Sequence, residues 1–313
     1  MNNPWTQLSP RFSASYKLNP QWNLNFNTGR YYQTPAYTML GYKDSNNQFI
    51  NRANNISFIQ CTHWVGGIEY SAMKNSRFTI EAFLKNYNNY PQSLRNGLSL
   101  ANAGGDFGVV GNEPVTSSSE GRAYGIEFFA QQKLYKGFYG LMAITLFRSE
   151  FTNAAQNDLT PSNWDQRYII NLTAGKKLKR NWEIGAKFRM TGGRPFTPYD
   201  TTLSSITTIW DINRQGLFDY TQVNANRLPW NHQLDVRIDK KYYFKRWNLN
   251  VFLDIQNLYM FAAKEQDILT VKQDVNGNPL LQPNTSNPAR YQTQFLENTN
   301  GTLLPTLGII IEY

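Results

Sequence analysis

The feature that most constrains the fold is a strict alternation of apolar and polar positions in the segment RWNLNVFLDIQNLY at 246–259. From Trp247 to Ile255 every second residue is apolar, and apart from Phe252 the residues between them are Asn and Asp. Because successive side chains of a β-strand point to opposite faces, this pattern predicts a strand with one apolar and one polar face. At about 3.3 Å per residue the segment would reach about 40 Å, longer than the usual strand of about 5 or 6 residues. We therefore expect a strand that crosses a thick layer.

The same alternation recurs in pairs of segments joined by short turns. The segments HQLDVRIDKKYYF (232–244) and QRYIINLTAGKKL (166–178) each precede a turn and a returning alternating segment, and RFSASYKL (11–18) does the same. Further hairpins turn near 72–76 and 135–137, and TLGIIIEY at 306–313 forms a last alternating run. The sequence therefore predicts about eleven antiparallel strands. In three hairpins a tryptophan begins the returning strand: Trp22, Trp182 and Trp247.

The connections between the predicted strands alternate strictly in length. Short ones lie at 18–21, 72–76, 135–137, 178–181 and 243–246, and long ones at 32–60, 89–120, 152–163, 194–229 and 261–303. Such long loops are uncommon in compact soluble domains. Tight turns at one end and long loops at the other are typical of a transmembrane β-barrel, whose periplasmic turns are short and whose extracellular loops are long.

Composition agrees with an all-β antiparallel transmembrane barrel. Aromatic residues make up 15% of the chain and charged residues 17%, while the mean hydropathy is −0.54. A polar chain rich in aromatic rings fits narrow apolar stripes, and no apolar run is long enough for a membrane helix. In the hydrocarbon of a membrane, every unpaired backbone N–H or C=O group costs free energy. Without a membrane helix, a closed sheet is therefore the remaining structure that can cross the membrane. We expect Trp247 to Ile255 to face lipid at odd positions and Asn248 to Gln256 to face the lumen at even ones. Trp22, Trp182 and Trp247 should form a girdle at one membrane boundary.

The net charge of +9 does not indicate a nucleic-acid partner, because Lys and Arg are spread over turns and alternate strand positions rather than clustered. A single cysteine, Cys61, excludes an internal disulfide and a thiolate metal site. The start MNNPWTQLSP lacks the basic and apolar regions of a secretory signal.

No motif predicts an enzyme. The sequence lacks G-x-S-x-G, G-x-x-x-x-G-K-S/T and H-E-x-x-H, and His63 and His232 lie in different predicted strands. DVNGN at 274–278 lacks the downstream Glu of a calcium loop and predicts a plain turn. AGGDFG at 103–108 predicts a flexible loop, and Asp235 and Asp239 share a face with basic neighbours in the lumen wall. We expect no catalytic residue, no cofactor and no metal site.

Many short motifs, in order along nearly the whole chain, resemble the C-terminal half of the barrel of a TonB-dependent outer-membrane receptor of the kind common in Bacteroidota. They are SPRFSASYKLNPQWNLNFNTGRYYQTP (9–35), GIEY (67–70), EAFLKNYNNYP (81–91), GRAYGIEFFAQQKL (121–134), TGGRPFTP (191–198), NRLPWNHQLDVRIDKKYYF (226–244), LNVFLDIQNLY (249–259) and LPTLGIIIEY (304–313). WDQRY at 164–168 departs from the family's "DxRH".

The resemblance implies a 22-stranded barrel with an N-terminal plug and a TonB-box peptide. Such receptors import scarce ligands (siderophores, haem, cobalamin or glycans) with force from the TonB complex. Residues 1–313 would be the C-terminal portion of the barrel, here without plug domain or signal peptide, which indicates a truncated or mis-started reading of a longer receptor. TonB would act only through the missing N-terminal region, and this chain alone should neither be exported nor transport. The loop pattern favours a siderophore- or cofactor-type receptor over the starch-utilisation branch.

Three other interpretations stay open: a passive porin-like outer-membrane barrel, a soluble β-sandwich or propeller, and a soluble β-rich glycan-binding protein. A plug domain upstream would exclude the first, and a water-soluble monomer would support the last.

Two sets of functional residues follow. Ligand recognition should lie in the long loops, where composition singles out polar-aromatic candidates, although loop aromatics also pack on one another. These candidates are Tyr90, Arg95, Trp164, Tyr199, Trp210 and Arg214. The last strand resembles the signal by which the barrel-assembly machinery recognises outer-membrane proteins. The expected partners are therefore this machinery and outer-membrane lipid. Its residues are Leu307, Ile309, Ile311 and Tyr313.

Overall fold

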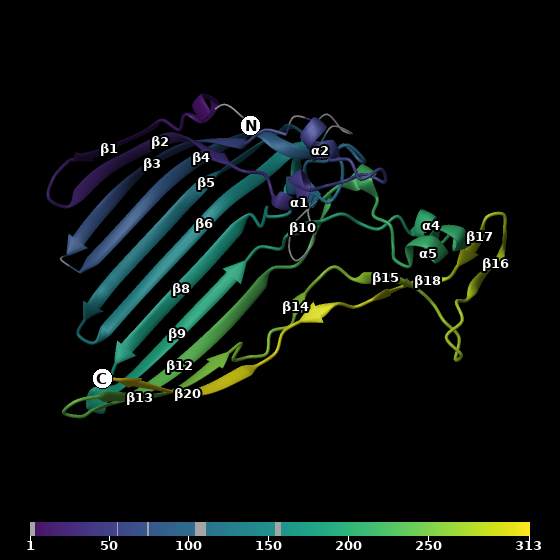
Figure 1. The fold of residues 1–313 in the computed structure, drawn as a ribbon. Helices are drawn as coiled ribbons and strands as arrows, with labels where there is room; N and C mark the ends of the chain where they lie inside the picture. The colour runs from purple at the N-terminus through teal and green to yellow at the C-terminus, as the bar shows by residue number, and fades with distance from the viewer. Residues whose placement is uncertain (1–3, 55, 74, 104–110, 154–157) are drawn as a thin grey trace.

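The computed structural model describes residues 4–54, 56–73, 75–103, 111–153 and 158–313. Most of them belong to one antiparallel sheet in which each strand pairs with its neighbour along the path β1-β2-β3-β4-β5-β6-β8-β9-β12-β13-β20 (Figure 1). These strands are β1 (Arg11–Lys17), β2 (Trp22–Gln33), β3 (Ile59–Met73), β4 (Ser76–Ser93), β5 (Val115–Tyr135), β6 (Phe138–Asn153), β8 (Tyr168–Lys177), β9 (Trp182–Thr191), β12 (Asn231–Tyr243), β13 (Asn248–Gln256) and β20 (Leu304–Glu312). Within the described residues, the path therefore has the eleven strands expected from the sequence.

The connections follow the predicted alternation of short and long. The tight turns lie at one end of the sheet, and the α-helices and minor strands lie at the other end (Figure 1). The long loops are not structureless, since each forms short elements of its own. Their α-helices are α1 (Tyr37–Leu40), α2 (Ile50–Ala53), α3 (Leu100–Ala103), α4 (Thr201–Ser204) and α5 (Thr207–Asn213), and a 3-10 helix, η3, covers Tyr220–Gln222. Their strands are β7 (Asp158–Pro161), which pairs with β6, and the pairs β10 (Pro195–Phe196) with β11 (Asn226–Arg227), β14 (Ala263–Lys264) with β19 (Thr299–Asn300), β15 (Ile268–Val271) with β18 (Thr293–Leu296) and β16 (Leu281–Ser286) with β17 (Ala289–Tyr291).

The register of the sheet gathers the apolar residues on one face. Ile238 of β12 lies opposite Ile184 of β9 and Leu253 of β13, and Leu253 lies opposite Leu307 of β20. Directly opposite residues share a face of the sheet, so these four form one apolar row. Ile184, Leu253 and Leu307 are exposed. The alternation in the sequence therefore does produce a sheet with one apolar face, which is turned outward from the protein.

The other face carries polar and charged side chains that pair with one another. The ion pairs on this face join neighbouring strands or alternate residues of one strand: Arg189 with Asp235 at 3.4 Å, Arg237 with Asp239 at 2.9 Å, and Lys241 with Glu183 at 3.2 Å. Asp239 also accepts a hydrogen bond from Asn250 on the next strand. Asp235 and Asp239 thus share a face with Arg237 and Lys241, as the sequence predicts.

Glycines on the polar face lie directly opposite aromatic residues. Gly121 faces Phe151 and Gly308 faces Phe252, and a Cβ built on either glycine would stand 2.3 or 2.2 Å from the opposing ring. Gly175 and Tyr139 form a third such pair. Placing a ring over a glycine fills the space of a missing side chain and reduces crowding on that face.

Strand β13 is shorter than the alternating sequence segment predicts, because it ends at Gln256. The next residue, Asn257, has φ 52° and therefore leaves the extended conformation. Its side chain forms two hydrogen bonds with the backbone of Phe261, one to the N–H at 2.9 Å and one to the C=O at 3.1 Å. An asparagine side chain competes here with the sheet for backbone partners, so the strand stops and the last long loop begins.

Tightly buried apolar residues occur mainly where the loops meet, rather than along the middle of the sheet. Met39, Ile56, Leu100 and Val115 form one cluster that joins the β2–β3 loop to the β4–β5 loop and the first residue of β5. Beside it, the buried Asn51 donates to Met39 O and Glu113 O and accepts from the N–H of Val115. In the described part of the chain, no helix has both the length and the apolar character needed to cross a bilayer.

The sheet is an open wall with two edges (Figure 1). Strand β1 pairs only with β2, and β20 pairs only with β13, among the described residues. The outer edge of each strand therefore presents backbone N–H and C=O groups with no partner strand.

Candidate ligand site among the loops

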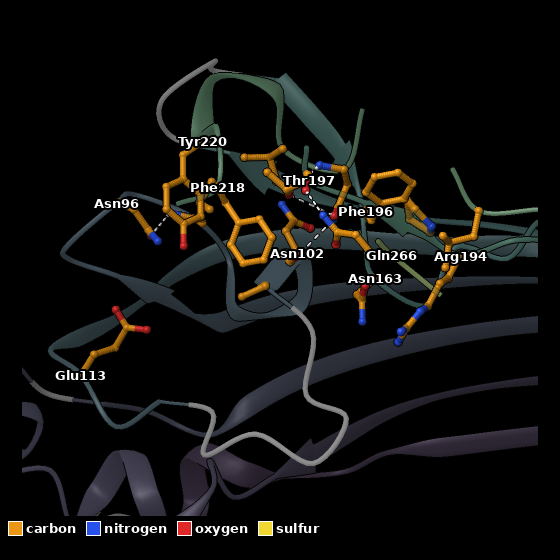
Figure 2. A pocket seen from close by; sticks show the side chains of 16 residues that line it. Asn96, Asn102, Glu113, Asn163, Arg194, Phe196, Thr197, Phe218, Tyr220 and Gln266 are labelled. Carbon is orange, nitrogen blue, oxygen red and sulfur yellow. Dashed lines mark hydrogen bonds between the residues drawn. The ribbon is translucent and has the colours of Figure 1, made fainter. Parts of the chain in front are cut away.

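A cavity of about 380 Å³ opens between four of the loops at the end of the sheet opposite the tight turns. Its walls come from the β4–β5 loop, the β6–β8 connection, the β9–β12 loop and the β13–β20 loop. Carboxamides are the commonest polar groups in the lining: Asn96, Asn102, Asn163, Asn224 and Gln266. Figure 2 shows Asn102, Thr197 and Gln266 near its centre, with Phe218 and Tyr220 along one side. A cavity built by four loops is completed only in the folded protein.

Asn224 joins three of these loops. Its backbone has φ 52°, and its buried side-chain amide donates to Asn102 O at 2.9 Å and to Pro161 O at 2.8 Å. Its backbone N–H also donates to Thr197 Oγ1 at 3.1 Å. Both donor positions of the amide are therefore satisfied by carbonyls of two other loops, which holds the cavity wall in one arrangement.

The buried carboxylate of Asp165 stabilises the loops next to the cavity. Asp165 is fully buried and accepts hydrogen bonds from the N–H of Ser149 at 2.9 Å and from Arg227 Nη2 at 2.8 Å. Arg148 Nε lies 3.3 Å from the same carboxylate as an ion pair. Arg227 also donates to the carbonyls of Asp165 and Gly193. Burial lowers the pKa of Arg227, and its hydrogen bond to Asp165 opposes that shift. The network joins β6, the residues after β7, and β11.

Two consecutive glycines allow this close assembly. A Cβ on Gly193 would lie 1.6 Å from Leu228 O, and one on Gly192 would lie 1.9 Å from Gln166 O. Both conflicts are with backbone, which cannot rotate away as a side chain can. The TGGRPFTP segment at 191–198 therefore needs glycine at both positions so that the chain leaving β9 can lie directly against the backbone of Leu228 and Gln166.

The charged residues of the lining already have partners. Arg194 lies 2.5 Å from Glu265, and Glu113 accepts a hydrogen bond from Ser93 Oγ. Tyr220 has a raised pKa, caused first by desolvation and then by the negative charge of Glu113. The cavity thus combines neutral amides, aromatic rings, an arginine in an ion pair and a hydrogen-bonded carboxylate.

Comparison with known proteins identifies the architecture. The sequence profile of the family described as "TonB dependent receptor-like, beta-barrel" matches residues 2–258. The chain belongs to this family. Its barrels lie in the outer membrane of Gram-negative bacteria, which places the chain there. Among curated proteins, none matches this sequence.

Solved structures of TonB-dependent receptors share the fold of this family member. The ferric citrate transporter FecA in its unliganded form is 15% identical with a TM-score of 0.58, over 97% of this chain and 38% of that one. The ferripyoverdine receptor of Pseudomonas aeruginosa is 11% identical with a TM-score of 0.56, over 96% and 33%. The ferric-catecholate import receptor Fiu from E. coli K12 is 12% identical with a TM-score of 0.53, over 96% and 34%. The chain thus spans about a third of the length of the structures it matches.

The structure places the six predicted loop candidates in different surroundings, and none of them lines the cavity. Tyr90 packs on Tyr87 and Phe151, with ring centroids 6.4 and 4.8 Å away. Trp210 is 5% exposed within α5, so its ring packs inside its loop.

The other four candidates are more accessible. Tyr199 stacks on Phe218, which does line the cavity, with centroids 4.9 Å apart, and burial raises the pKa of Tyr199. Arg95 and Trp164 are exposed and directly adjoin the lining residues Asn96 and Asn163. Arg214 forms an exposed ion pair with Asp211 at 3.6 Å. Tyr90, Trp210 and Tyr199 thus pack on neighbouring side chains, which is the role that the sequence offers for loop aromatics as the alternative to ligand binding.

Sequence reasoning missed the amides that line the cavity. Asparagine is abundant throughout the loops, and no local signal separates Asn102, Asn163 and Asn224 from the others. The RPFTP segment is the nearest sequence signal, because Arg194, Phe196 and Thr197 all line the cavity. Among the described residues, no group of three or more His, Cys, Asp or Glu side chains lies close enough to hold a metal ion. Residues 104–108 of the predicted flexible loop AGGDFG lie outside the described residues.

Proposed function

We propose that this chain forms the C-terminal half of the barrel of a TonB-dependent importer and that its long loops receive a scarce ligand from outside the cell. The cavity between four loops is the observation that carries this proposal, because ligand sites in proteins are concave and formed where elements converge. The solved relatives include receptors for ferric citrate and ferripyoverdine by their titles. We infer a transport role rather than an enzymatic one, in keeping with a family of receptors.

The open edges support a larger barrel. In lipid, each unpaired backbone group costs several kcal/mol, so the outer edges of β1 and β20 require partner strands. Further strands of the receptor would close the barrel, and a plug domain in its lumen would face the charged side of the sheet. The TonB complex would act through that plug domain, not through the strands described here.

The apolar face supports the predicted orientation in the membrane. Trp22 and Trp182 begin β2 and β9, and Trp247 directly precedes β13, so all three lie at the end with the tight turns. Along β12, Tyr242 lies ten positions after His232, which packs against Trp230 and Tyr259. At about 3.3 Å per residue and a tilt of about 40°, this segment spans about 25 Å along the membrane normal. That height matches the apolar band of outer-membrane barrels, with the tryptophans at the periplasmic boundary.

The last strand fits the proposed assembly signal. Leu307, Ile309 and Ile311 alternate along β20 and are 76%, 65% and 56% exposed, on the apolar face. With the exposed Tyr313 they would meet lipid in the finished barrel and the barrel-assembly machinery before it. A lipid-facing strand and an assembly signal require the same residues, so both roles are compatible.

Dependence on energy separates the importer from a passive porin. A strain with the receptor gene as its only route for a nutrient would be grown on limiting ferric citrate, a ferric catecholate, haem, cobalamin or oligosaccharides, with and without TonB. We expect growth on at least one nutrient to require both the receptor and TonB. Growth that needs the receptor but not TonB would make it a porin, and no receptor-dependent growth would reject the transport proposal.

A further inference from the structure

The loop cavity lacks the charge that an anionic ligand needs. Of the 16 lining residues, only Arg194 and Glu113 carry charge, and Arg194 is already 2.5 Å from Glu265. Proteins bind carboxylates and phosphates mainly through guanidinium groups that offer two donors to the anion. Using Arg194 for that purpose would leave Glu265 without this partner. The lining is therefore poorly suited to a multiply charged ferric chelate.

Its amides instead match a ligand that carries hydroxyl groups. A carboxamide both donates and accepts hydrogen bonds, and a hydroxyl does the same, so the two groups pair in either direction. Asn163 joins the lining through its side chain while its backbone N–H is held by Ala101 O at 3.1 Å. Gln266 donates one hydrogen bond to Thr197 O at 2.8 Å, which leaves its side-chain oxygen to accept. Several neutral donors and acceptors thus converge on one space.

One amide oxygen in the lining has an unmet requirement. Asn102 is 2% exposed, and none of the described residues donates a hydrogen bond to its Oδ1. A buried acceptor without a donor is uncommon and costs about 1–3 kcal/mol. Because Asn102 lines the cavity, a hydroxyl donor that reaches its side-chain oxygen would satisfy this acceptor.

Aromatic rings supply apolar surface beside the amides, with the planes of Phe218 and Tyr220 inclined at 65° to each other. Phe218 and Tyr220 lie 6.5 Å apart between ring centroids and are 40% and 48% exposed (Figure 2). Tyr199 supports Phe218 from behind by stacking at 4.9 Å. A ligand with alternating hydroxyl edges and C–H faces fits such a surface, because the faces bury against the rings while the edges bond the amides.

We propose that this cavity binds an uncharged, hydroxyl-rich ligand, namely a segment of a neutral oligosaccharide. Its hydroxyls pair with Asn163, Gln266 and Asn102, and its apolar face packs on Phe218 and Tyr220. This inference rests on the proposed import function and names the ligand class for the same site. It departs from the sequence-based preference for a siderophore- or cofactor-type ligand.

Binding to the receptor that contains this chain, purified in detergent, tests the inference by calorimetry. The probes are the hexasaccharides of glucose in α-1,4 and β-1,4 linkage, of xylose and of mannose, together with ferric citrate and a ferric catecholate. We expect one of the neutral hexasaccharides to bind, and Asn163→Ala and Phe218→Ala each to weaken it by about 3- to 10-fold. Tyr37→Ala and Asn46→Ala, an exposed aromatic and an amide in another loop, serve as matched controls that should leave binding unchanged.

A variant that adds a positive charge to the cavity distinguishes a neutral sugar from an anionic chelate. Asn163→Lys should weaken the neutral sugar but strengthen an anionic chelate if such a chelate occupied the cavity. Binding of a ferric chelate alone, tightened by Asn163→Lys, would overturn the sugar assignment and leave the import function standing. Sugar binding that the cavity variants do not change would overturn the site. If no probe binds and no nutrient shows growth that depends on TonB, both proposals fail.

Discussion

Removing the buried carboxylate of Asp165 should loosen the base of the loop assembly by an amount that the structure allows us to work out. In Asp165→Ala, the N–H of Ser149 loses its acceptor at 2.9 Å, which costs about 1–3 kcal/mol for a buried donor. Arg227 Nη2 loses a charged hydrogen bond at 2.8 Å, worth about 1.5–3 kcal/mol when fully buried. Since the Arg227 side chain is 23% exposed and Arg148 36%, water recovers part of this loss. We expect a net cost of about 3 kcal/mol, the lower end of the range for breaking a buried ion pair.

Hydrogen exchange is the appropriate assay, because the effect is local and large barrels do not unfold reversibly. A cost of about 3 kcal/mol corresponds to a roughly 150-fold increase in the opening equilibrium. Mass spectrometry of a peptide spanning 147–153 should show this increase at the amide of Ser149, whose hydrogen bond is the one removed. Asp165→Asn keeps one acceptor oxygen but no charge, so its exchange should rise by less.

An exposed ion pair provides the matched control. Asp211 and Arg214 are 3.6 Å apart with side chains 44% and 69% exposed, and such pairs contribute about 0–1 kcal/mol. Asp211→Ala should therefore raise exchange in 207–214 by less than about fivefold. If Asp165→Ala raises the exchange of Ser149 no more than this control does in its own segment, the carboxylate does not hold the loops together and our reasoning is refuted.

Further predictions address the glycine motif, the girdle and the last strand. Gly193→Ala puts a Cβ against Leu228 O, so we expect faster hydrogen exchange in 226–229 and weakened ligand binding. The control, Gly277→Ala, lies at an open turn and should affect neither. Unchanged hydrogen exchange in 226–229 would contradict the clash. In single-tryptophan variants that retain Trp22, Trp182 or Trp247, tryptophan fluorescence should be quenched more by lipids brominated near the headgroup than by lipids brominated at the chain end. Stronger quenching by the chain-end lipids would reject the girdle. Deleting Tyr313 from the intact receptor should lower its surface level, measured by labelling of whole cells; unchanged assembly would leave only the structural role of β20. Gly121→Val should force the ring of Phe151 off its glycine and reduce heat-stable folded barrel on gels, while Gly140→Val, with a roomier environment, should do so less.

The facing of the strands could be predicted because it is a local property. Side chains alternate with a period of two whatever lies next to the strand, so Leu249, Val251 and Leu253 had to share a face before their neighbours were known. The turns were predictable for a related reason, since each short hairpin is closed by residues adjacent in sequence. The one strand end that alternation predicts wrongly is that of β13. It depends on a local contact between Asn257 and Phe261, which the alternation of apolar and polar residues does not reveal.

The loop site could not be predicted, because its contacts are distant in sequence and have no period. Asn224 is 122 residues from Asn102 along the chain, and Arg227 is 62 residues from Asp165. An asparagine that holds two loops together has the same local sequence character as one that faces solvent. Selecting candidates by aromatic and basic character therefore led to Tyr90 and Trp210, whose rings pack on other side chains of the protein.

The sequence by itself determined the barrel class, the number of strands, the two faces of the sheet and the end at which the loops lie. These follow from alternation, turn spacing and the need to pair every backbone group in lipid, all of which act along the chain or between adjacent strands. Only the tertiary structure decided which loop residues meet, where the cavity lies and that its arginine, Arg194, is already paired with Glu265. The physical reason is that the loops are held by single hydrogen bonds, ion pairs and close glycine contacts, each between residues that the sequence places far apart.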